Sequence, residues 1–191
     1  MKHRSLISAM LGGHLAMPAA AQCPPMASES RVGFVYTLEL EHADGRIERD
    51  PPVHNLIPVE GIAHMLGVTF KSAVQVPTWY IALYEGDYNP LATTTAATFA
   101  AQATECTAYS AGTRPAFVSG AVVAGALDNA ATRAEYTFTA NKTVHGGALL
   151  SSNVKGGGGG LCMSLVRFPT PKVCETGSTL RIVAGAGFTS I

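Results

Sequence analysis

The segment from Thr78 to Pro90 constrains the fold more than any other part of the chain. It predicts a strand over residues 79–84, followed by a turn at residues 86–90. Large side chains occupy both alternating sets of strand positions, with Trp79, Ile81 and Leu83 in one set and Tyr80 and Tyr84 in the other. Successive side chains of a strand point to opposite faces of the sheet, so this strand must be covered on both sides. The segment therefore predicts a β-sandwich, or a strand buried by a partner.

The clearest alternation of apolar with smaller or polar residues runs from Val32 to Leu40 and predicts a second strand. An Asp-Gly pair at residues 44–45 predicts a hairpin turn after it. The return strand is expected to begin at Ile47 and to end at Pro51.

Two short helices are expected between the strands. The first covers residues 58–66, with Pro58 in its first turn, an apolar series of Val59, Ile62 and Leu66, and Gly67 as its stop. Residues 68–76 then read as a strand. The second helix begins at residues 93–95, where threonines can cap it, and continues to about Ala103.

The remaining sequence has a β pattern throughout. Further strands are expected at residues 115–119, 121–127, 133–139, 143–151, 161–168 and 178–189. Short strands at such regular spacing indicate a sandwich or barrel-like fold. We therefore predict an all-β fold, an antiparallel β-sandwich or jelly-roll-like domain with one or two short helices and an N-terminal arm. Residues 1–25 form the arm, or a signal-like segment, and residues 26–191 form a single β-sandwich domain.

The N-terminal segment permits two interpretations. Lys2 and Arg4 precede an apolar run, and the alanines at residues 19–21 fit a signal-peptidase site. Gly12, Gly13 and His14 interrupt that run, which is also too short to span a bilayer. We expect an arm that becomes ordered by packing on another surface.

The charge composition suggests contact with other subunits. Only 14% of the residues are charged, the formal net charge is zero, and 47% of the residues are hydrophobic. Solubility usually benefits from a net charge away from zero. Residues 1–60 hold five Lys/Arg and seven Asp/Glu, whereas residues 114–191 hold seven and three. This asymmetry suits docking against charged neighbours or self-association, although a neutral, alanine-rich β-domain explains the composition equally well.

The four cysteines, Cys23, Cys106, Cys162 and Cys174, are widely spaced and fit no zinc-binding pattern. They would form two disulfides in an exported chain and remain small buried thiols in a bacterial cytosol. We favour the thiols.

No arrangement of residues indicates catalysis, and we expect no enzyme activity, cofactor or metal. The six histidines form neither of the common zinc motifs, and His42 lies beside a hairpin turn, where polar residues are usual. Glu85, Asp87 and Asn89 resemble the start of a calcium loop. That loop needs glycine at the position of Pro90 and glutamate at that of Ala96, so a solvated turn is the better interpretation. No basic cluster with interleaved aromatics indicates nucleic-acid binding.

Two long segments carry a family resemblance, His54 to Gly61 (HNLIPVEG) and Thr78 to Pro90 (TWYIALYEGDYNP). Shorter matching pieces are residues 103–109, the Asp-Asn turn at 128–129 with the strand after it, and residues 141–144. In these segments the chain resembles a family of small β-rich virion structural proteins of tailed bacteriophages. The resemblance covers about residues 32–191. The family pattern starts near Met26, so residues 1–25 depart from it.

The resemblance implies a non-enzymatic part of the virion, most simply a capsid cement or decoration protein. Such a protein is assembled in the host cytoplasm, lies on the capsid surface, and binds the major capsid protein and copies of itself, without nucleic acid or membrane. The alternatives are a tail fibre or tail adaptor protein and a secreted bacterial β-sandwich binding module.

For partner contacts we predict aromatic residues of the strongest segment and the tip of a glycine run. The candidates are Trp79, Tyr84, Tyr88, Gly156, Gly157, Gly158, Gly159 and Gly160. Trp79 and Tyr84 lie in a strand, where such residues usually belong to the core. The glycine run reads either as a flexible hairpin tip or as a segment that packs closely on a neighbour.

Overall fold

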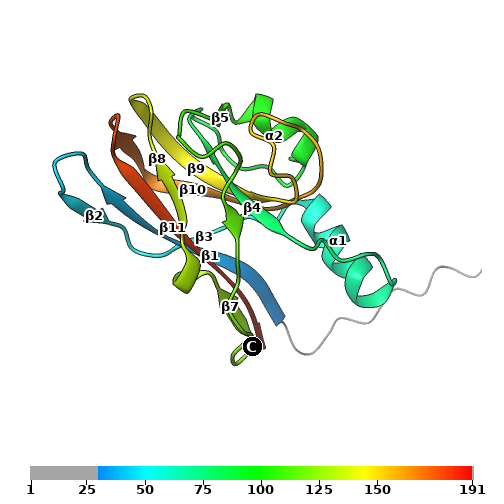
Figure 1. Ribbon diagram of the computed structural model, residues 1–191. Helices are drawn as coiled ribbons and strands as arrows, with labels where there is room; N and C mark the ends of the chain where they lie inside the picture. The colour runs from blue at the N-terminus through cyan, green and yellow to red at the C-terminus, as the bar shows by residue number, and fades with distance from the viewer. Residues whose placement is uncertain (1–29, 191) are drawn as a thin grey trace, which may run out of the picture.

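The computed structural model describes residues 30–190, which fold into two packed antiparallel sheets (Figure 1). The six-stranded sheet contains β2 (Ile47–Arg49), β1 (Ser30–Glu41), β11 (Thr179–Ser190), β7 (Ala126–Asp128), β3 (Val53–His54) and β8 (Ala134–Thr137). The five-stranded sheet contains β10 (Cys162–Cys174), β9 (Lys142–Leu150), β4 (Trp79–Tyr84), β5 (Glu105–Cys106) and β6 (Ala116–Phe117). The prediction of an all-β antiparallel sandwich is confirmed. The expected arm, residues 1–25, lies outside the described residues.

Strands β1 and β11 form a long ribbon through the six-stranded sheet. They pair without interruption from Ser30 opposite Ser190 to Glu41 opposite Thr179. Inward-facing residues of both strands fill the space between the sheets. The buried ones are Phe34, Tyr36, Leu38 and Leu40 on β1 and Leu180, Ile182 and Ala184 on β11. Because the ribbon crosses the whole sandwich, each of its ends lies at a different end of the molecule.

Strand β4 is covered on both faces, as the sequence predicts. Ile81 and Leu83 pack in the core between the sheets. Ala82 and Tyr84 face the other way, into a second cluster under α2 (Ala96–Gln102). Thr95 caps α2 as expected, through a reciprocal capping box with Thr98.

The hydroxyl groups of two buried tyrosines tie the sheets together. The Tyr36 hydroxyl donates to Ser164 Oγ at 2.9 Å, and the Tyr136 hydroxyl donates to the Ile81 carbonyl oxygen at 2.7 Å. Buried hydroxyls are costly unless they are hydrogen-bonded, so these pairs specify how the sheets face one another.

The first helix is longer than predicted, and the strand expected at residues 68–76 is wrong. Helix α1 spans Val59–Phe70, and Gly67 lies inside it instead of ending it. The Gly67 carbonyl accepts a hydrogen bond from the Lys71 N–H, and Ser72 then leaves the helix with a φ of +55°. An apolar series interrupted by glycine does not by itself distinguish a continuing helix from a new strand.

Other strand boundaries also differ from the prediction, and β6 covers only residues 116–117 of the expected 115–119. Residues 121–127 form a strand only at β7, because the chain turns tightly at Ala124 with a φ of +49°. Strand β10 continues past Pro169 and Pro171, where a register shift between Arg167 and Lys172 interrupts its pairing with β9. A bulge of this kind accommodates prolines that lack a backbone N–H.

Candidate functional site

One end of the sandwich is left open between the two sheets. At this end the β1–β11 ribbon extends past the five-stranded sheet, and α1 stands beside it (Figure 1). Val32 and Phe188 oppose one another at the end of the ribbon, and both are exposed. The core therefore stops before the ribbon does.

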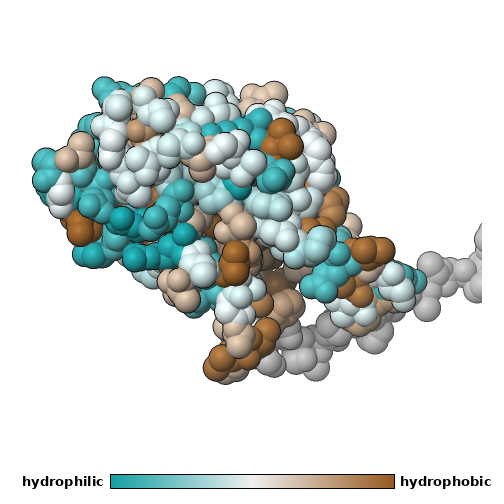
Figure 2. Space-filling view, viewed as in Figure 1, coloured by the Kyte–Doolittle hydropathy of each residue, from teal (hydrophilic) through white to brown (hydrophobic). Residues whose placement is uncertain are grey.

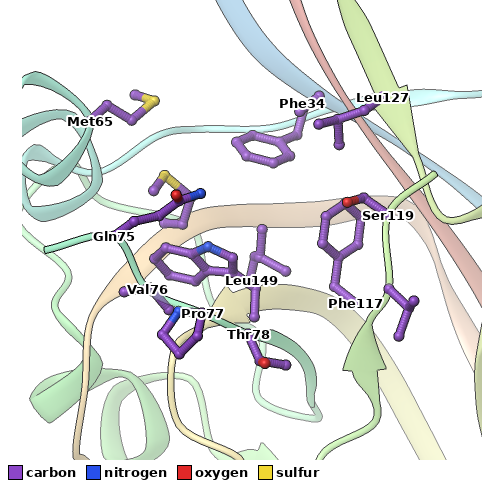
Figure 3. A pocket seen from close by; sticks show the side chains of 14 residues that line it. Phe34, Met65, Gln75, Val76, Pro77, Thr78, Phe117, Ser119, Leu127 and Leu149 are labelled. Atoms are coloured by element: carbon purple, nitrogen blue, oxygen red, sulfur yellow. The ribbon is translucent and has the colours of Figure 1, made fainter. Parts of the chain in front are cut away.

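A cavity of about 450 Å³, here called the end cavity, occupies the opening (Figure 3). Phe34 and Leu127 form its wall on the six-stranded sheet, and Trp79, Phe117 and Leu149 form the wall on the five-stranded sheet. Its other lining residues are Met65, Gln75, Val76, Pro77, Thr78, Val118, Ser119, Met163 and Ala186. None of these side chains ionises. The end cavity can hold an apolar group but offers no general acid, base or nucleophilic thiol.

The surface around the end cavity is also apolar. Val118, Val122 and Val123 are exposed on the loop that leads to β7. In Figure 2 brown surfaces lie over β7 and over α1 with a hollow between them, whereas teal surfaces lie towards β2. The sequence accounts for the contrast, because no charged residue occurs at residues 72–84, 115–127 or 182–190.

Helix α1 exposes a row of large apolar side chains, of which Ile62 also lines a pocket against β1. Val59, Ile62, Leu66 and Phe70, here called the α1 face, are 60%, 44%, 53% and 73% exposed. Their spacing of three and four residues places them on one side of the helix. The sequence identified the first three as an apolar series of the predicted helix. The structure instead uses Gly61 for packing, since a Cβ there would lie 2.7 Å from the Met163 carbonyl oxygen.

Of the predicted contact residues, Trp79 lies at this end. Its partly buried ring lines the end cavity and meets the His64 ring of α1 edge-on, with 5.7 Å between ring centroids. Trp79 is the only tryptophan of the chain. The structure thus brings it together with Phe117 and α1, residues that the sequence had not associated with it.

Tyr84 does not fit the prediction of a partner contact. Its side chain is fully buried, and its hydroxyl donates to the Val166 carbonyl oxygen at 3.0 Å. Burial also raises its pKa well above the usual range for tyrosine. The large side chain belongs to the core under α2, because the second face of β4 is covered by the protein itself.

Tyr88 is only partly buried, as expected for a turn residue, but its polar atoms are used internally. Its hydroxyl pairs with Thr94 Oγ1, and its carbonyl oxygen accepts a 2.9 Å hydrogen bond from Arg167. It lies beside Tyr84 and not beside Trp79. The two predicted aromatic contacts that remain accessible therefore do not form one site.

The glycine run is attached to the protein's own surface at Gly156–Gly158, although all of its residues except Gly157 are exposed. Glu105 and Arg114 form a buried ion pair with hydrogen bonds of 2.8 and 2.6 Å, and two backbone groups of the run bond to it. The Gly156 N–H donates to Glu105, and the Gly157 carbonyl accepts from Arg114. A Cβ at Gly158 would lie 3.1 Å from Ala97 of α2. The close packing that glycine permits is thus used within the chain.

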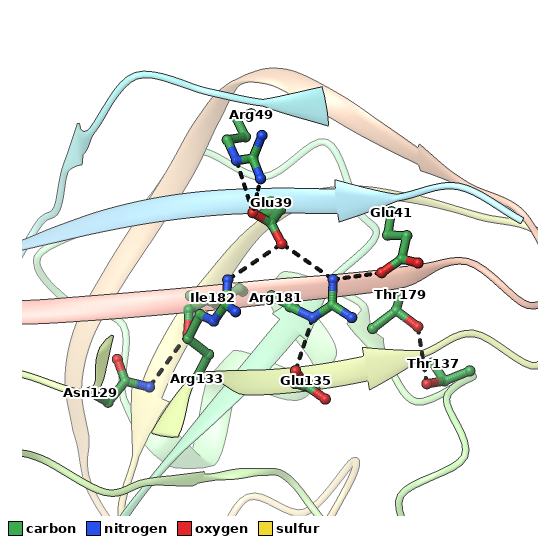
Figure 4. A network of polar contacts seen from close by, with 10 residues as sticks. All are labelled: Glu39, Glu41, Arg49, Asn129, Arg133, Glu135, Thr137, Thr179, Arg181 and Ile182. Atoms are coloured by element: carbon green, nitrogen blue, oxygen red, sulfur yellow. Dashed lines mark hydrogen bonds and ion pairs between the residues drawn. The ribbon is translucent and has the colours of Figure 1, made fainter. Parts of the chain in front are cut away.

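The outer face of the six-stranded sheet carries a network of ion pairs (Figure 4). Glu39 binds Arg49, Arg133 and Arg181, and Arg181 also binds Glu41 and Glu135. Lys172 is buried beside Glu48 and Asp50. Acidic residues from the first third of the chain therefore pair with basic residues from the last third, and these internal pairs account for much of the charge asymmetry in the sequence.

Other polar residues also pair within the chain. His42 Nδ1 lies 2.9 Å from Glu175, and Glu85 and Asp87 of the predicted turn bind Lys142 and Arg167. Among residues 30–190 no three His, Cys, Asp or Glu side chains gather as metal ligands would. No helix in this range is long and apolar enough to span a membrane.

Three of the four cysteines are buried free thiols, and Cys23 lies outside the described residues. Burial raises the pKa of the Cys162 and Cys174 thiols to about 12 and also raises that of Cys106. A thiol with a raised pKa is a poor nucleophile at neutral pH. These cysteines act as small apolar residues of the core, as the sequence favoured.

Comparison with known proteins gives no match to a protein-family model, to a curated protein or to a solved structure.

Proposed function

We propose that the protein is a non-enzymatic structural protein of a tailed-bacteriophage virion that binds the major capsid protein shell as a cement or decoration protein. The virion context comes from the resemblance of segments 54–61 and 78–90. The observation that carries a binding role is the end cavity, an uncharged opening between two sheets surrounded by exposed valines.

The end cavity has the properties of a binding pocket for apolar side chains of another protein. Binding energy at interfaces concentrates in a few large side chains that fill desolvated pockets. The cavity volume of about 450 Å³ is within the range of pockets that hold small ligands or several side chains. Val118 would contact the inserted group, and the exposed Val122 and Val123 of the same loop would extend the apolar surface.

A shell protein does not need a tight single site. Many copies on one particle engage repeated, identical partners, so moderate contacts add up when the copies are linked. An uncharged contact is also little affected by salt, because screening acts on charges. A protein that must stay attached across changes of ionic strength benefits from such a contact.

The test of this function is quantitative mass spectrometry of purified virions. The proposal predicts a copy number comparable with that of the major capsid protein and an N-terminal peptide that precedes Gln22. A far lower copy number would move the protein to the tail. Absence from particles, or a mature chain that begins at Gln22, would contradict the proposal and favour a secreted module.

Binding to shells that lack the protein tests the surface itself. Val122→Glu places a charge beside the end cavity and is expected to reduce occupancy strongly, since burying an unpaired charge is costly. Val173→Glu on β10 is the matched control, because Val173 is a similarly exposed valine outside this end. Equal loss in both variants would contradict the assignment.

A further inference from the structure

We infer that the α1 face binds the α1 face of a second copy of this chain, so that two molecules pair about a two-fold axis with their α1 helices in contact. This inference concerns a surface other than the end cavity and does not depend on the virion proposal.

The α1 face is large enough to need a cover. Val59, Ile62, Leu66 and Phe70 together expose about 400 Å² of surface, given that a large aromatic side chain covers about 150–250 Å². That area lies within the range of about 300–600 Å² for the largest apolar patch of a typical monomer, a patch that is often functional. It is also about half of the ~800 Å² that each partner contributes to a standard interface. The area therefore indicates a modest dimer that dissociates on dilution.

The helix has little support from its own sequence. It has 12 residues, including two glycines and several β-branched residues, and isolated helices of this length are marginal in water. Of its residues only Gly61 is buried against the body. Contact along the outer side would stabilise a helix that its own body holds only along the other side.

The charges on α1 favour a second copy over a charged partner. Glu60 is the only Asp, Glu, Lys or Arg in the helix, and it points inward. Its Oε2 accepts hydrogen bonds from the Ala96 N–H at 2.9 Å and the Cys162 N–H at 2.6 Å. The outer side therefore offers no charge to attract or repel a partner. An identical uncharged face is complementary to it, as an isologous contact requires.

The spacing of the α1 face also suits a helix pair. Val59, Ile62 and Leu66 follow one another at three and four residues, the spacing with which side chains of two helices interdigitate. In an antiparallel pair about a two-fold axis, residues near the middle of the helix meet their own counterparts. Leu66 would then lie close to Leu66 of the second copy.

Sedimentation velocity of the purified full chain over a concentration series is the direct test. The wild-type protein is expected to dimerise, and Leu66→Glu to raise the dissociation constant at least about 100-fold, because it places two like charges in an apolar contact. Val173→Glu, the matched exposed control, is expected to dimerise as the wild type does. Thermal unfolding should show that all three proteins remain folded.

A crosslink locates the contact. In a Cys23→Ser background, Leu66→Cys should give a covalent dimer with a short bis-maleimide reagent, whereas Val173→Cys should not. A monomeric wild type, or a dimer unaffected by Leu66→Glu, would overturn the inference. If the wild type is monomeric and its α1 is nevertheless protected from hydrogen exchange, residues 1–29 of the same chain cover the α1 face instead. None of these results depends on particle binding, so failure here leaves the virion proposal to be judged by the copy number.

Discussion

The β1–β11 ribbon has two halves with opposite chemistry. In the charged half, Glu39 and Arg181 lie in a network that joins four strands, β1, β2, β8 and β11, and the loop residue Arg133. In the apolar half, Val32 opposite Phe188 extends beyond the second sheet, beside α1 and an uncharged cavity. The backbone pairing is the same in both halves. The side chains therefore decide which half completes its contacts within the chain and which half leaves apolar groups exposed.

The two halves of the ribbon therefore differ in how they can interact with other molecules. Charges in the charged half pair within the same chain, so they neither attract nor repel other molecules strongly. The end cavity is lined by uncharged residues, and the valines of the loop before β7 are exposed. A protein built in this way is expected to bind through the open end and to present its ion-paired surface to solvent.

The largest expected effect comes from breaking the buried ion pair between Glu105 and Arg114, to which the glycine run bonds. Arg114→Ala leaves the Glu105 carboxylate buried without its partner, and this should lower the free energy of unfolding by about 3–5 kcal/mol. Arg49→Ala is the matched control, since its ion pair with Glu39 is exposed on the arginine side and should cost about 1 kcal/mol or less. Urea unfolding measures both values. Similar losses would mean that the buried pair does not hold the glycine run.

A pair of substitutions on one face of β1 compares the two halves directly. Leu40→Ala in the closed half should cost about 2–5 kcal/mol, because it leaves a cavity between the sheets. Val32→Ala in the apolar half should cost about 0.5 kcal/mol or less in the monomer, since Val32 is exposed. A large loss for Val32→Ala in dilute protein would show that the open end is covered within the chain.

The charged half should respond to acid, and the open end should not. Burial tends to raise the pKa of Glu39, but Arg49, Arg133 and Arg181 outweigh it, so the pKa falls below its ordinary value of 4.5. A carboxylate with a lowered pKa stabilises the fold above its unfolded pKa and loses that contribution as the pH falls through the folded value. The melting temperature should therefore decline below about pH 4.5. Glu39→Gln should decline less steeply, and equal slopes would contradict the role of this network.

Thiol reactivity involves the smallest change in stability, but it distinguishes the buried core from the exposed open end. In a Cys23→Ser variant, Cys106, Cys162 and Cys174 should not react with a thiol reagent at neutral pH until the protein is unfolded, since burial raises the pKa of each. An added cysteine, Val122→Cys, should react at once because that position is exposed. Fast reaction of Cys106, Cys162 and Cys174 would indicate that the core opens readily in the folded protein.

Much of the fold could be predicted from the sequence because it rests on local patterns. The alternation at residues 32–40 and the double-sided strand at 79–84 each specify burial directly, and both strands lie where expected. Capping by Thr95 likewise depends on adjacent residues. The strand predicted at 68–76 failed because an apolar series around Gly67 fits a helix and a strand equally well.

The candidate site was only partly predictable. Trp79 was singled out, but its neighbours in the end cavity come from residues 34, 117 and 149, which only the tertiary fold brings together. Tyr84 was misjudged because the sequence does not reveal that α2 covers it. The α1 face could have been recognised from its composition, since a helix that is apolar on all sides is normally buried.

Hydrogen exchange of the protein, free and bound to purified shells, tests most directly whether the open end is the binding end. Binding through that end predicts added protection in residues 75–79 and 117–127, and little change in residues 37–49 and 179–183. Protection confined to the charged half, or no difference between free and bound protein, would contradict it.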